Sequence, residues 1–206
     1  LYFVYQMDDI TERKQLELRD RIEKKRLQST LSISQTPVTS IAKLNDLMLE
    51  AAVGLSGSEF GYIYFYDEKT EEFSLHAWSK AVMKSCEIVD KHTRYQLATT
   101  GFWGEAVRQR RPVVDNDMLA PGVLKKGFPP GHVHLKRFMS APVFIDGKIV
   151  AVVGVANKQE PYSQLDVDQL VLMSDSLWNI MERRRAEEEL NRANASLDRR
   201  VRERAR

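Results

Sequence analysis

Residues 140–158 read Ser-Ala-Pro-Val-Phe-Ile-Asp-Gly-Lys-Ile-Val-Ala-Val-Val-Gly-Val-Ala-Asn-Lys. The dipeptide Asp146-Gly147 readily adopts the positive φ angles of a tight hairpin turn. It separates two largely apolar runs, residues 140–145 and 148–156. The stretch therefore predicts two long, adjacent antiparallel strands.

A second hairpin is predicted earlier in the chain. Residues 61–66 and 72–78 are aromatic-rich runs, and the polar residues between them are typical of a turn. A helix precedes this hairpin, because apolar residues recur every three or four positions from 40 to about 55, as one buried helix face requires. These apolar residues are Ile41, Leu44, Leu47, Met48, Ala51, Ala52 and Leu55. Gly54 and Gly57 mark the end of the predicted helix.

A closing helix is predicted after the long hairpin. Ser163 and Asp166 have the spacing of a capping box, which opens a helix. The apolar residues that follow at helical spacing are Leu170, Met173, Leu177, Ile180 and Met181. Beyond Glu182 the sequence is highly charged, and a stripe with spacings of four and three residues predicts a parallel coiled coil. The stripe consists of Leu190, Asn194, Leu197 and Val201. A simple solvated helix is the alternative interpretation of this charged run.

The N-terminal segment is predicted to begin with a short strand over residues 1–6. Asp9 and Glu12 then have the spacing of a helix-capping pair, which predicts a charged helix through about Leu31. Residues 2–14, with the sequence Tyr-Phe-Val-Tyr-Gln-Met-Asp-Asp-Ile-Thr-Glu-Arg-Lys, resemble the last strand and exit motif of PAS domains. That resemblance implies a connector helix after the motif.

The segment between the two hairpins, residues 79–136, contains no long strand pattern. Residues 102–110 have helical spacing, and residues 112–116 form a candidate short strand. We expect this long excursion to cover one side of the sheet.

The composition favours one sizeable cytoplasmic domain. The 206 residues carry 31 Lys and Arg against 29 Asp and Glu, and a net charge of +2 gives no field that would attract nucleic acid or an anionic membrane. The single cysteine, Cys86, excludes an internal disulfide, which suits a reducing compartment. No apolar run approaches the length of a membrane span, so we expect no membrane contact by this segment.

Four sequence blocks resemble the GAF domains of prokaryotic multidomain sensor histidine kinases. They are Gly101-Phe102-Trp103-Gly104-Glu105-Ala106-Val107, Arg111-Pro112-Val113-Val114-Asp115-Asn116-Asp117, Gly131-His132-Val133 and Val153-Gly154-Val155-Ala156-Asn157-Lys158. The resemblance implies an α+β fold in which helices cover one face of a central antiparallel sheet and a ligand pocket lies on the other. It also implies signal reception, in which a bound ligand alters the flanking helices.

The resemblance sets the expected domain organisation. The expected segments are the end of a PAS domain at 1–10, a connector helix at 11–35, a GAF sensor domain at 36–182 and a coiled-coil helix at 183–206. The last helix resembles the entry to a histidine kinase dimerisation domain in a two-component system. We therefore expect a homodimer that forms through the flanking helices and binds a small-molecule ligand or haem.

The resemblance implies candidate residues for a haem cofactor. Some archaeal and bacterial members of this subfamily hold haem through a thioether to a cysteine in the pocket-covering region, with a histidine from the Gly-His-Val block as axial ligand. Cys86 and His132 match those positions, and His132 is the candidate metal ligand. Trp78, Phe102 and Trp103 are the candidate pocket-lining residues.

Other interpretations of these residues remain open. A lone cysteine such as Cys86 is more often an inert small apolar side chain, and His92 is an alternative ligand. His76 lies in the predicted strand beside Trp78, which favours a packed strand residue. A linear tetrapyrrole is disfavoured, because Glu87 follows the cysteine where His or Leu is common in phytochrome-type domains.

A cyclic nucleotide is a further candidate ligand. Asn157, Lys158, Tyr162 and Asp166 resemble a motif of cyclic-nucleotide-binding GAF domains, but Tyr162 replaces Phe and Val167 replaces Glu. A salt bridge between Lys158 and Asp166 that ties the last strand to the closing helix is the favoured interpretation.

An enzymatic role is disfavoured. One cysteine does not support the resolving-cysteine chemistry of the methionine sulfoxide reductases built on this fold, and the sequence has no Ser-His-Asp pattern. The expected role is that of a regulatory fragment whose parent protein carries a C-terminal histidine kinase. The alternative function is a ligand-free dimerisation and signal-transmission spacer.

Overall fold

The computed structural model of the chain describes residues 2–36, 41–85, 94–122 and 133–204. Its centre is a six-stranded antiparallel sheet with the strand order β3-β2-β1-β6-β5-β4. The strands are β1 Phe60–Asp67, β2 Glu72–Trp78, β3 Arg94–Gln96, β4 Val113–Asp115, β5 Phe138–Ile145 and β6 Lys148–Ala156. The predicted α+β fold class is confirmed.

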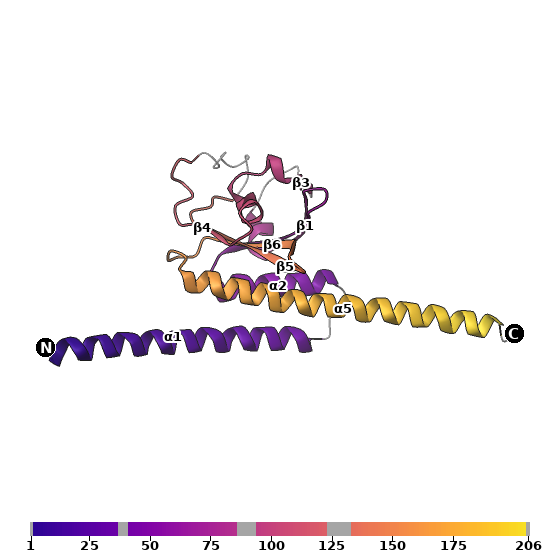
Figure 1. Ribbon diagram of the computed structural model, residues 1–206, viewed down its shortest axis with the longest axis horizontal. Coiled ribbons are helices and arrows are strands. Elements are labelled where there is room, and N and C mark those ends of the chain that lie inside the picture. Colours follow the sequence, from indigo (N-terminus) through magenta and orange to yellow (C-terminus); the bar gives the residue numbers. More distant parts are fainter. Residues whose placement is uncertain (1, 37–40, 86–93, 123–132, 205–206) are drawn as a thin grey trace.

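Long helices cover one face of this sheet (Figure 1). Helices α2 (Ile41–Ser56) and α5 (Gln164–Arg204) lie directly against it, and α1 (Tyr2–Gln35) lies along the outer side of that pair. On the opposite face, the described residues form short elements only. These are α3 (Lys80–Ser85), the 3₁₀ turns Leu97–Thr99 and Phe102–Gly104, and α4 (Glu105–Arg108).

Both predicted hairpins are present. Strands β5 and β6 pair up to Ile145 and Lys148, and the turn residues Asp146 and Gly147 have φ angles of 49° and 75°. Positive φ at both central residues is what a tight two-residue hairpin turn requires, which explains the Asp-Gly dipeptide. The other hairpin consists of β1 and β2, and β1 also pairs with β6.

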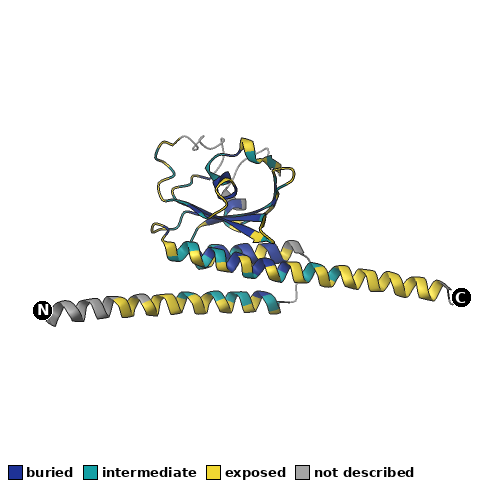
Figure 2. Cartoon of the chain, in the orientation of Figure 1, coloured by how far each residue is buried: buried dark blue, intermediate teal, exposed yellow. Residues whose placement is uncertain are grey.

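The main core lies between the sheet and the helices. Alternate residues of β1 point to opposite faces, so Ile63 and Phe65 pack toward the helices while Tyr62, Tyr64 and Tyr66 face the other way. Leu49 of α2, Met139 of β5 and Met181 of α5 are completely buried in this layer. Figure 2 shows the resulting burial along the sheet-facing sides of α2 and α5.

The predicted strand at residues 1–6 is wrong, because one continuous helix begins at Tyr2 and ends at Gln35. The pair Asp9 and Glu12 therefore lies inside the helix rather than at its start. No strand of the described ranges lies beside this segment to pair with its backbone, whereas a helix pairs its own N–H and C=O groups. The proposed PAS end at 1–10 stays a prediction.

Helix α5 continues without interruption beyond the domain. Its residues up to Met181 alternate between buried and exposed, but nearly all residues from Glu182 onward are exposed. The side chains of the predicted stripe are open to solvent in this single chain, with Leu190 61%, Leu197 56% and Val201 65% exposed. Their pairing in a coiled coil stays a prediction. None of the helices in the described ranges combines the length and apolar character of a membrane-spanning segment.

Candidate functional site

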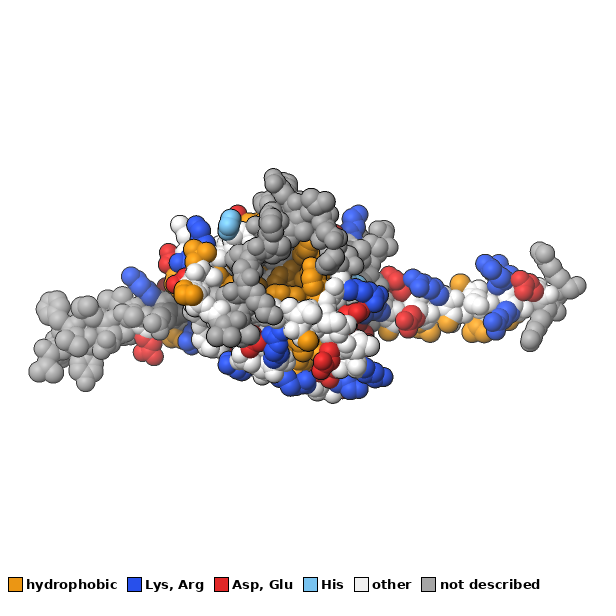
Figure 3. Space-filling model, turned by 90° about the horizontal axis from the view of Figure 1, so that it is seen from above, with side chains coloured by type: hydrophobic (Ala, Val, Ile, Leu, Met, Phe, Trp, Pro, Cys, Tyr) orange, Lys and Arg blue, Asp and Glu red, His pale blue; other side chains and the backbone are white. Residues whose placement is uncertain are grey.

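The face of the sheet opposite the helices carries a concentration of aromatic side chains. Seen from above that face, the molecule is hollowed, and the floor of the hollow is lined with hydrophobic side chains (Figure 3). The aromatic residues of this face are Phe60, Tyr62, Tyr64, Tyr66, Phe73, Trp78, Tyr95, Phe102, Trp103 and Phe138. We call this surface the aromatic hollow.

The structure brings the three predicted pocket residues to this hollow. Trp103 packs at the β2 end, where its ring centroid lies 4.8 Å from that of Phe73 and 5.3 Å from that of Tyr64. Phe102 lies toward β5, with its ring 6.0 Å from that of Phe138. Trp78 packs in the same cluster as Phe102 and, like it, is only half-buried.

Tyr62 occupies the middle of the hollow because the neighbouring strands leave space for its ring. Tyr62 pairs with Gly154 on β6, which pairs in turn with Ser140 on β5. A Cβ atom on Gly154 would lie 2.3 Å from the Tyr62 ring, so only glycine allows the ring to lie across β6. The Tyr62 hydroxyl reaches the Ser140 hydroxyl at 3.3 Å, and burial raises the tyrosine pKa despite this hydrogen bond.

The loop that carries Phe102 and Trp103 is held by Arg108. The guanidinium of Arg108 donates hydrogen bonds to the carbonyl oxygens of Leu97, Thr100 and Gly101. It also forms an ion pair with the buried carboxylate of Glu105, at 2.6 Å. Hydrogen bonds from Gln109 and Arg108 outweigh the effect of burial and hold the Glu105 pKa below its usual range. These contacts fix the aromatic pair against the sheet.

Two predicted cofactor residues, Cys86 and His132, and the alternative ligand His92 lie outside the described residues. The described residues include Val82, four residues before Cys86, and Val133, which directly follows His132. Val82 on α3 and Val133 before β5 pack in one cluster with Phe138, at the edge of the aromatic hollow. The described residues include no group of three His, Cys, Asp or Glu side chains that could hold a metal ion.

Three residues that belong to the alternative ligand interpretations, His76, Lys158 and Asp166, lie within the described part of the chain. The ring of His76 on β2 stacks on Phe65 at a centroid distance of 3.5 Å, which places it on the helix side of the sheet, away from the hollow. Lys158 Nζ lies 2.6 Å from Asp166 Oδ1, so the predicted salt bridge is confirmed. Both of its side chains are largely buried.

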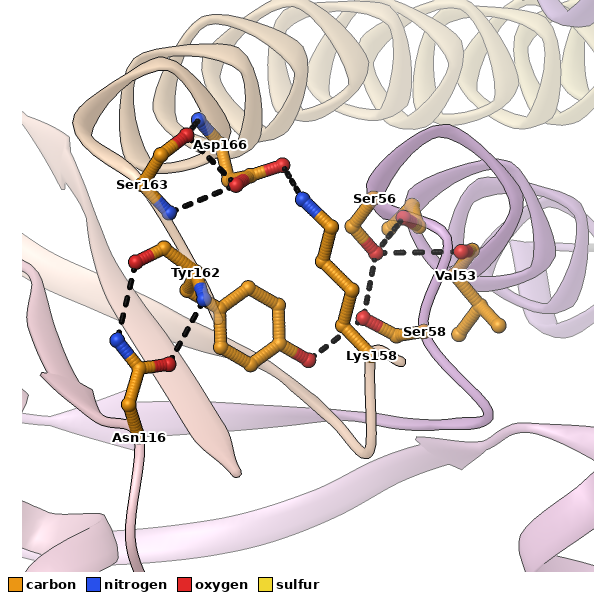
Figure 4. Close-up of polar contacts among 9 residues, drawn as sticks. Val53, Ser56, Ser58, Asn116, Lys158, Tyr162, Ser163 and Asp166 are labelled. Carbon is orange, nitrogen blue, oxygen red and sulfur yellow. Dashed lines mark hydrogen bonds and ion pairs between the residues drawn. The ribbon is translucent and has the colours of Figure 1, made fainter. Parts of the chain in front are cut away.

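The salt bridge belongs to a polar junction at the start of α5 (Figure 4). Ser163 and Asp166 form the predicted capping box, in which the Ser163 N–H donates to Asp166 Oδ2 at 2.8 Å. The backbone of Tyr162 is held by the Asn116 amide through one accepted and one donated hydrogen bond. The Tyr162 hydroxyl bonds Ser58 just beyond α2 at 2.7 Å. The junction thus connects the ends of α2, β4 and β6 to α5.

The charge on Asp166 is stabilised within this junction. Burial acts to raise its pKa, but hydrogen bonds from Lys158 and Ser163 outweigh burial and hold the pKa below its usual range. The capping box was predicted from residue spacing, and the Lys158–Asp166 pair from the resemblance of these residues to a motif of cyclic-nucleotide-binding GAF domains. Sequence reasoning missed Asn116 and Ser58, whose roles depend on chain segments that are distant in sequence.

Comparisons with known proteins give both a family and a relative. A family model described as GAF domain matches residues 38–182. The methyl sulfide methyltransferase-associated sensor of Methanosarcina acetivorans is 43% identical to this chain over 196 residues. The alignment covers 92% of this chain but 20% of that relative, so the chain spans about a fifth of the relative's length.

Solved structures share the fold at low sequence identity. The GAF domain of a phosphoenolpyruvate-protein phosphotransferase from Coxiella burnetii has a TM-score of 0.65 at 16% identity, covering 83% of this chain and 98% of that one. A free methionine-R-sulfoxide reductase from Neisseria meningitidis has a TM-score of 0.60 at 16% identity, with coverages of 82% and 93%. The GAF domain of a putative sensor histidine kinase from Pseudomonas syringae pv. tomato has a TM-score of 0.54 at 16% identity, with coverages of 88% and 99%.

Proposed function

The chain belongs to the GAF domain family, and we propose that it is the sensory domain of a signalling protein. In this proposal, a small molecule or cofactor binds in the aromatic hollow and changes the setting of α5. The observation that carries the proposal is the hollow itself, a surface of buried and half-buried aromatic side chains on the sheet face opposite the long helices. The relative from Methanosarcina acetivorans, named a sensor, supports it.

We further propose that the bound group is haem. Val82 precedes Cys86 by four residues and Val133 directly follows His132, and both valines pack in one cluster at the edge of the hollow. The described lining of this hollow is mainly aromatic and aliphatic, which suits the large apolar surface of a porphyrin. A bound haem would supply an iron whose redox or ligand state can report a signal.

The two proposed residues have different roles. Cys86 would hold the porphyrin through a thioether to one of its vinyl groups; addition of the S–H group across the vinyl double bond would need no oxidant. The His132 imidazole would bind the haem iron through a ring nitrogen. Trp78, Phe102 and Trp103 contact the ring and exclude water.

Transmission is proposed to run from the hollow to α5 through the polar junction. Asn116 lies directly after β4 and holds the backbone of Tyr162, which immediately precedes the capping box of α5. A shift of the β4 end is therefore coupled to the first turn of α5. We propose that α5 pairs with a second copy beyond Glu182 and leads to a histidine kinase output, and that the domain works in the cytoplasm.

The haem proposal is tested by absorption spectroscopy after reconstitution with haem. We expect a Soret band in the wild type, which denaturing extraction does not remove. In Cys86→Ala the band should form but the haem should become extractable. In His132→Ala the position of the band should change, because the iron loses its axial nitrogen.

A matched control is His134→Ala, which removes an exposed histidine two residues away whose backbone carbonyl accepts a hydrogen bond from Asn157. Its spectrum should equal that of the wild type. Absence of a Soret band in the wild type would eliminate haem. Unchanged extraction and spectra in both site variants would eliminate the two assigned residues.

The rival function is a ligand-free spacer that relays strain between its flanking helices. The close packing of Trp103 against Tyr64, Phe73 and Tyr95 favours it, because side chains fill that end of the hollow. Native mass spectrometry of protein purified from cells separates the two functions. A bound small molecule supports the sensor, whereas bare protein with no haem-induced rise in melting temperature supports the spacer.

A further inference from the structure

A small cavity with polar groups lies inside the main core, away from the aromatic hollow. It is enclosed by α2, α5 and the helix-facing side of β1, β5 and β6. Its volume is about 10 Å³, measured as the space open to the centre of a water molecule. A space of about 10–15 Å³ by this measure is the smallest that holds one water. The cavity is therefore too small for any organic ligand.

Three polar side chains line this otherwise apolar cavity. They are Asn45 from α2 and Ser174 and Trp178 from α5, and they are 1%, 5% and 5% exposed. Within the described ranges, Asn45 Oδ1 and Nδ2, Ser174 Oγ and Trp178 Nε1 are buried and have no hydrogen-bond partner. Buried polar groups in folded proteins are nearly always hydrogen-bonded, so these atoms require a partner inside the cavity.

Ser174 differs from the other helical serines nearby. Ser176 donates its hydroxyl to the Leu172 carbonyl one turn earlier, at 2.6 Å, and Ser56 does the same to Ala52 at 2.8 Å. Such back-bonding is the usual way for a helical serine to satisfy its hydroxyl. Ser174 makes no such bond, and its hydroxyl remains available to the cavity.

We infer that this cavity is a binding site for one water molecule, held by Asn45, Ser174 and Trp178. The chemistry of the three groups matches the four hydrogen bonds of water. The Trp178 indole N–H and the Asn45 amide N–H donate to the water oxygen. The water donates its two protons to Asn45 Oδ1 and Ser174 Oγ.

The site joins the two helices that cover the sheet. Ser174 and Trp178 are one turn apart on α5, and Asn45 faces them from α2, so a shared water fixes the rotation of α5 about its axis relative to α2. The surrounding methionine, leucine and valine side chains offer no alternative polar partner. The inference does not depend on whether the aromatic hollow binds haem.

The test is nuclear magnetic resonance of protein labelled with ¹⁵N-tryptophan. The chain has three tryptophans, and Trp178→Phe identifies the indole signal of Trp178. We expect its Nε1–H to show cross-relaxation with a long-lived bound water. Absence of this contact in the wild type would overturn the inference, as would a crystal structure in which Asn45 bonds Trp178 directly.

Variants of the other two residues sharpen the assignment. Ser174→Ala should keep the water contact, because Asn45 and Trp178 still hold the molecule. Loss of the contact in this variant would show that the signal came from the serine hydroxyl and would overturn the proposed water site. The double variant Asn45→Leu with Ser174→Ala should lose the contact, and persistence would overturn the proposed ligand set. Ser176→Ala, whose hydroxyl bonds its own helix, is the matched control and should match the wild type.

Discussion

The two faces of the sheet are built from different side chains and are covered differently. The layer between the helix face of the sheet and helices α2 and α5 is packed with aliphatic and methionine residues. Examples are Met139, Ala151 and Leu177, which are at most 2% exposed. The opposite face presents aromatic residues such as Trp78 and Phe102, which remain half-buried under short turns. One sheet thus separates the main core from the face proposed to bind a ligand, because strand residues alternate between the faces.

We therefore expect substitutions on the helix face to change stability most, and substitutions on the aromatic face to change the proposed ligand binding. Long helices seal the first face, so a removed side chain there leaves a cavity that the packing does not close. On the second face, half-buried aromatic side chains would provide contact area for the proposed ligand, and the Tyr62 hydroxyl bonds a partner on the sheet.

The largest effect on stability is expected on the helix face. Leu177→Ala removes a side chain that is 2% exposed and should lower the free energy of unfolding by about 2–5 kcal/mol. Urea denaturation followed by circular dichroism measures this change. Leu172→Ala on the same helix removes a side chain that is 47% exposed and should change stability by no more than about 0.5 kcal/mol. Equal losses of unfolding free energy in the two variants would contradict the proposal that the buried helix face carries the stability of the domain.

A smaller effect is expected on the aromatic face, at Gly154. Gly154→Ala forces the Tyr62 ring off the sheet, because its new Cβ would lie 2.3 Å from that ring, and should cost about 1–3 kcal/mol. Combining it with Tyr62→Ala should cost less than the sum of the single changes. Additive losses would show that the ring and Gly154 are not coupled. Gly54→Ala, in α2 with open space around it, should be neutral or stabilising.

The polar junction at the edge between the two faces should respond to acid. The pKa of Asp166 is lowered in the folded state, so its contribution is present above the ordinary aspartate pKa and is lost as the pH falls through the lower, folded value. Stability should therefore decline below about pH 4. Asp166→Asn should reduce stability at neutral pH by about 1–3 kcal/mol and flatten this decline.

Thermal unfolding as a function of pH measures this response. Asp168→Asn, which alters an exposed aspartate bonded to the neutral Gln164 side chain, is the matched control and should keep the wild-type decline. An Asp166→Asn profile that still falls as steeply as the wild type would assign the acid response to another group.

The smallest effect on domain stability is expected outside both faces, on the far part of α5. Leu190→Ser with Leu197→Ser should weaken the proposed dimer in sedimentation experiments, because both residues belong to the apolar stripe. The unfolding free energy of the domain should change by no more than about 0.5 kcal/mol, since both residues are exposed. Arg192→Ser with Arg199→Ser alters the opposite side of the helix and should leave the dimer intact. A monomeric wild type would refute the pairing.

Local chemistry made much of the fold predictable. The Asp146-Gly147 turn and the Ser163 capping box need only neighbouring residues, and both formed as expected. The N-terminal aromatic run has strand-like composition, but no strand among the described residues pairs with it, and it forms a helix. In α2 the apolar pattern included Leu47, which is 38% exposed, and passed over Asn45, which is 1% exposed.

The candidate site was predictable only in part. The Gly-Phe-Trp block led to Phe102 and Trp103, and both lie on the aromatic hollow. The alignment of Tyr62 with Gly154 and Ser140 depends on the register of three strands, which spacing in one sequence does not contain. The hydrogen bonds from Arg108 to the carbonyls of Leu97 and Thr100 depend on the fold of the intervening loop, which residue spacing also does not contain.

The continuity of α5 has a consequence for how such a domain can be exchanged or engineered. A helix turns by about 100° per residue, so inserting one residue after Met181 would rotate every later side chain by that angle about the axis. A seven-residue insertion would nearly restore the original direction. The length of α5 between the sheet and a fused partner therefore sets the direction in which the later side chains point. Functional chimeras of this domain should be those whose insertions or deletions preserve that direction.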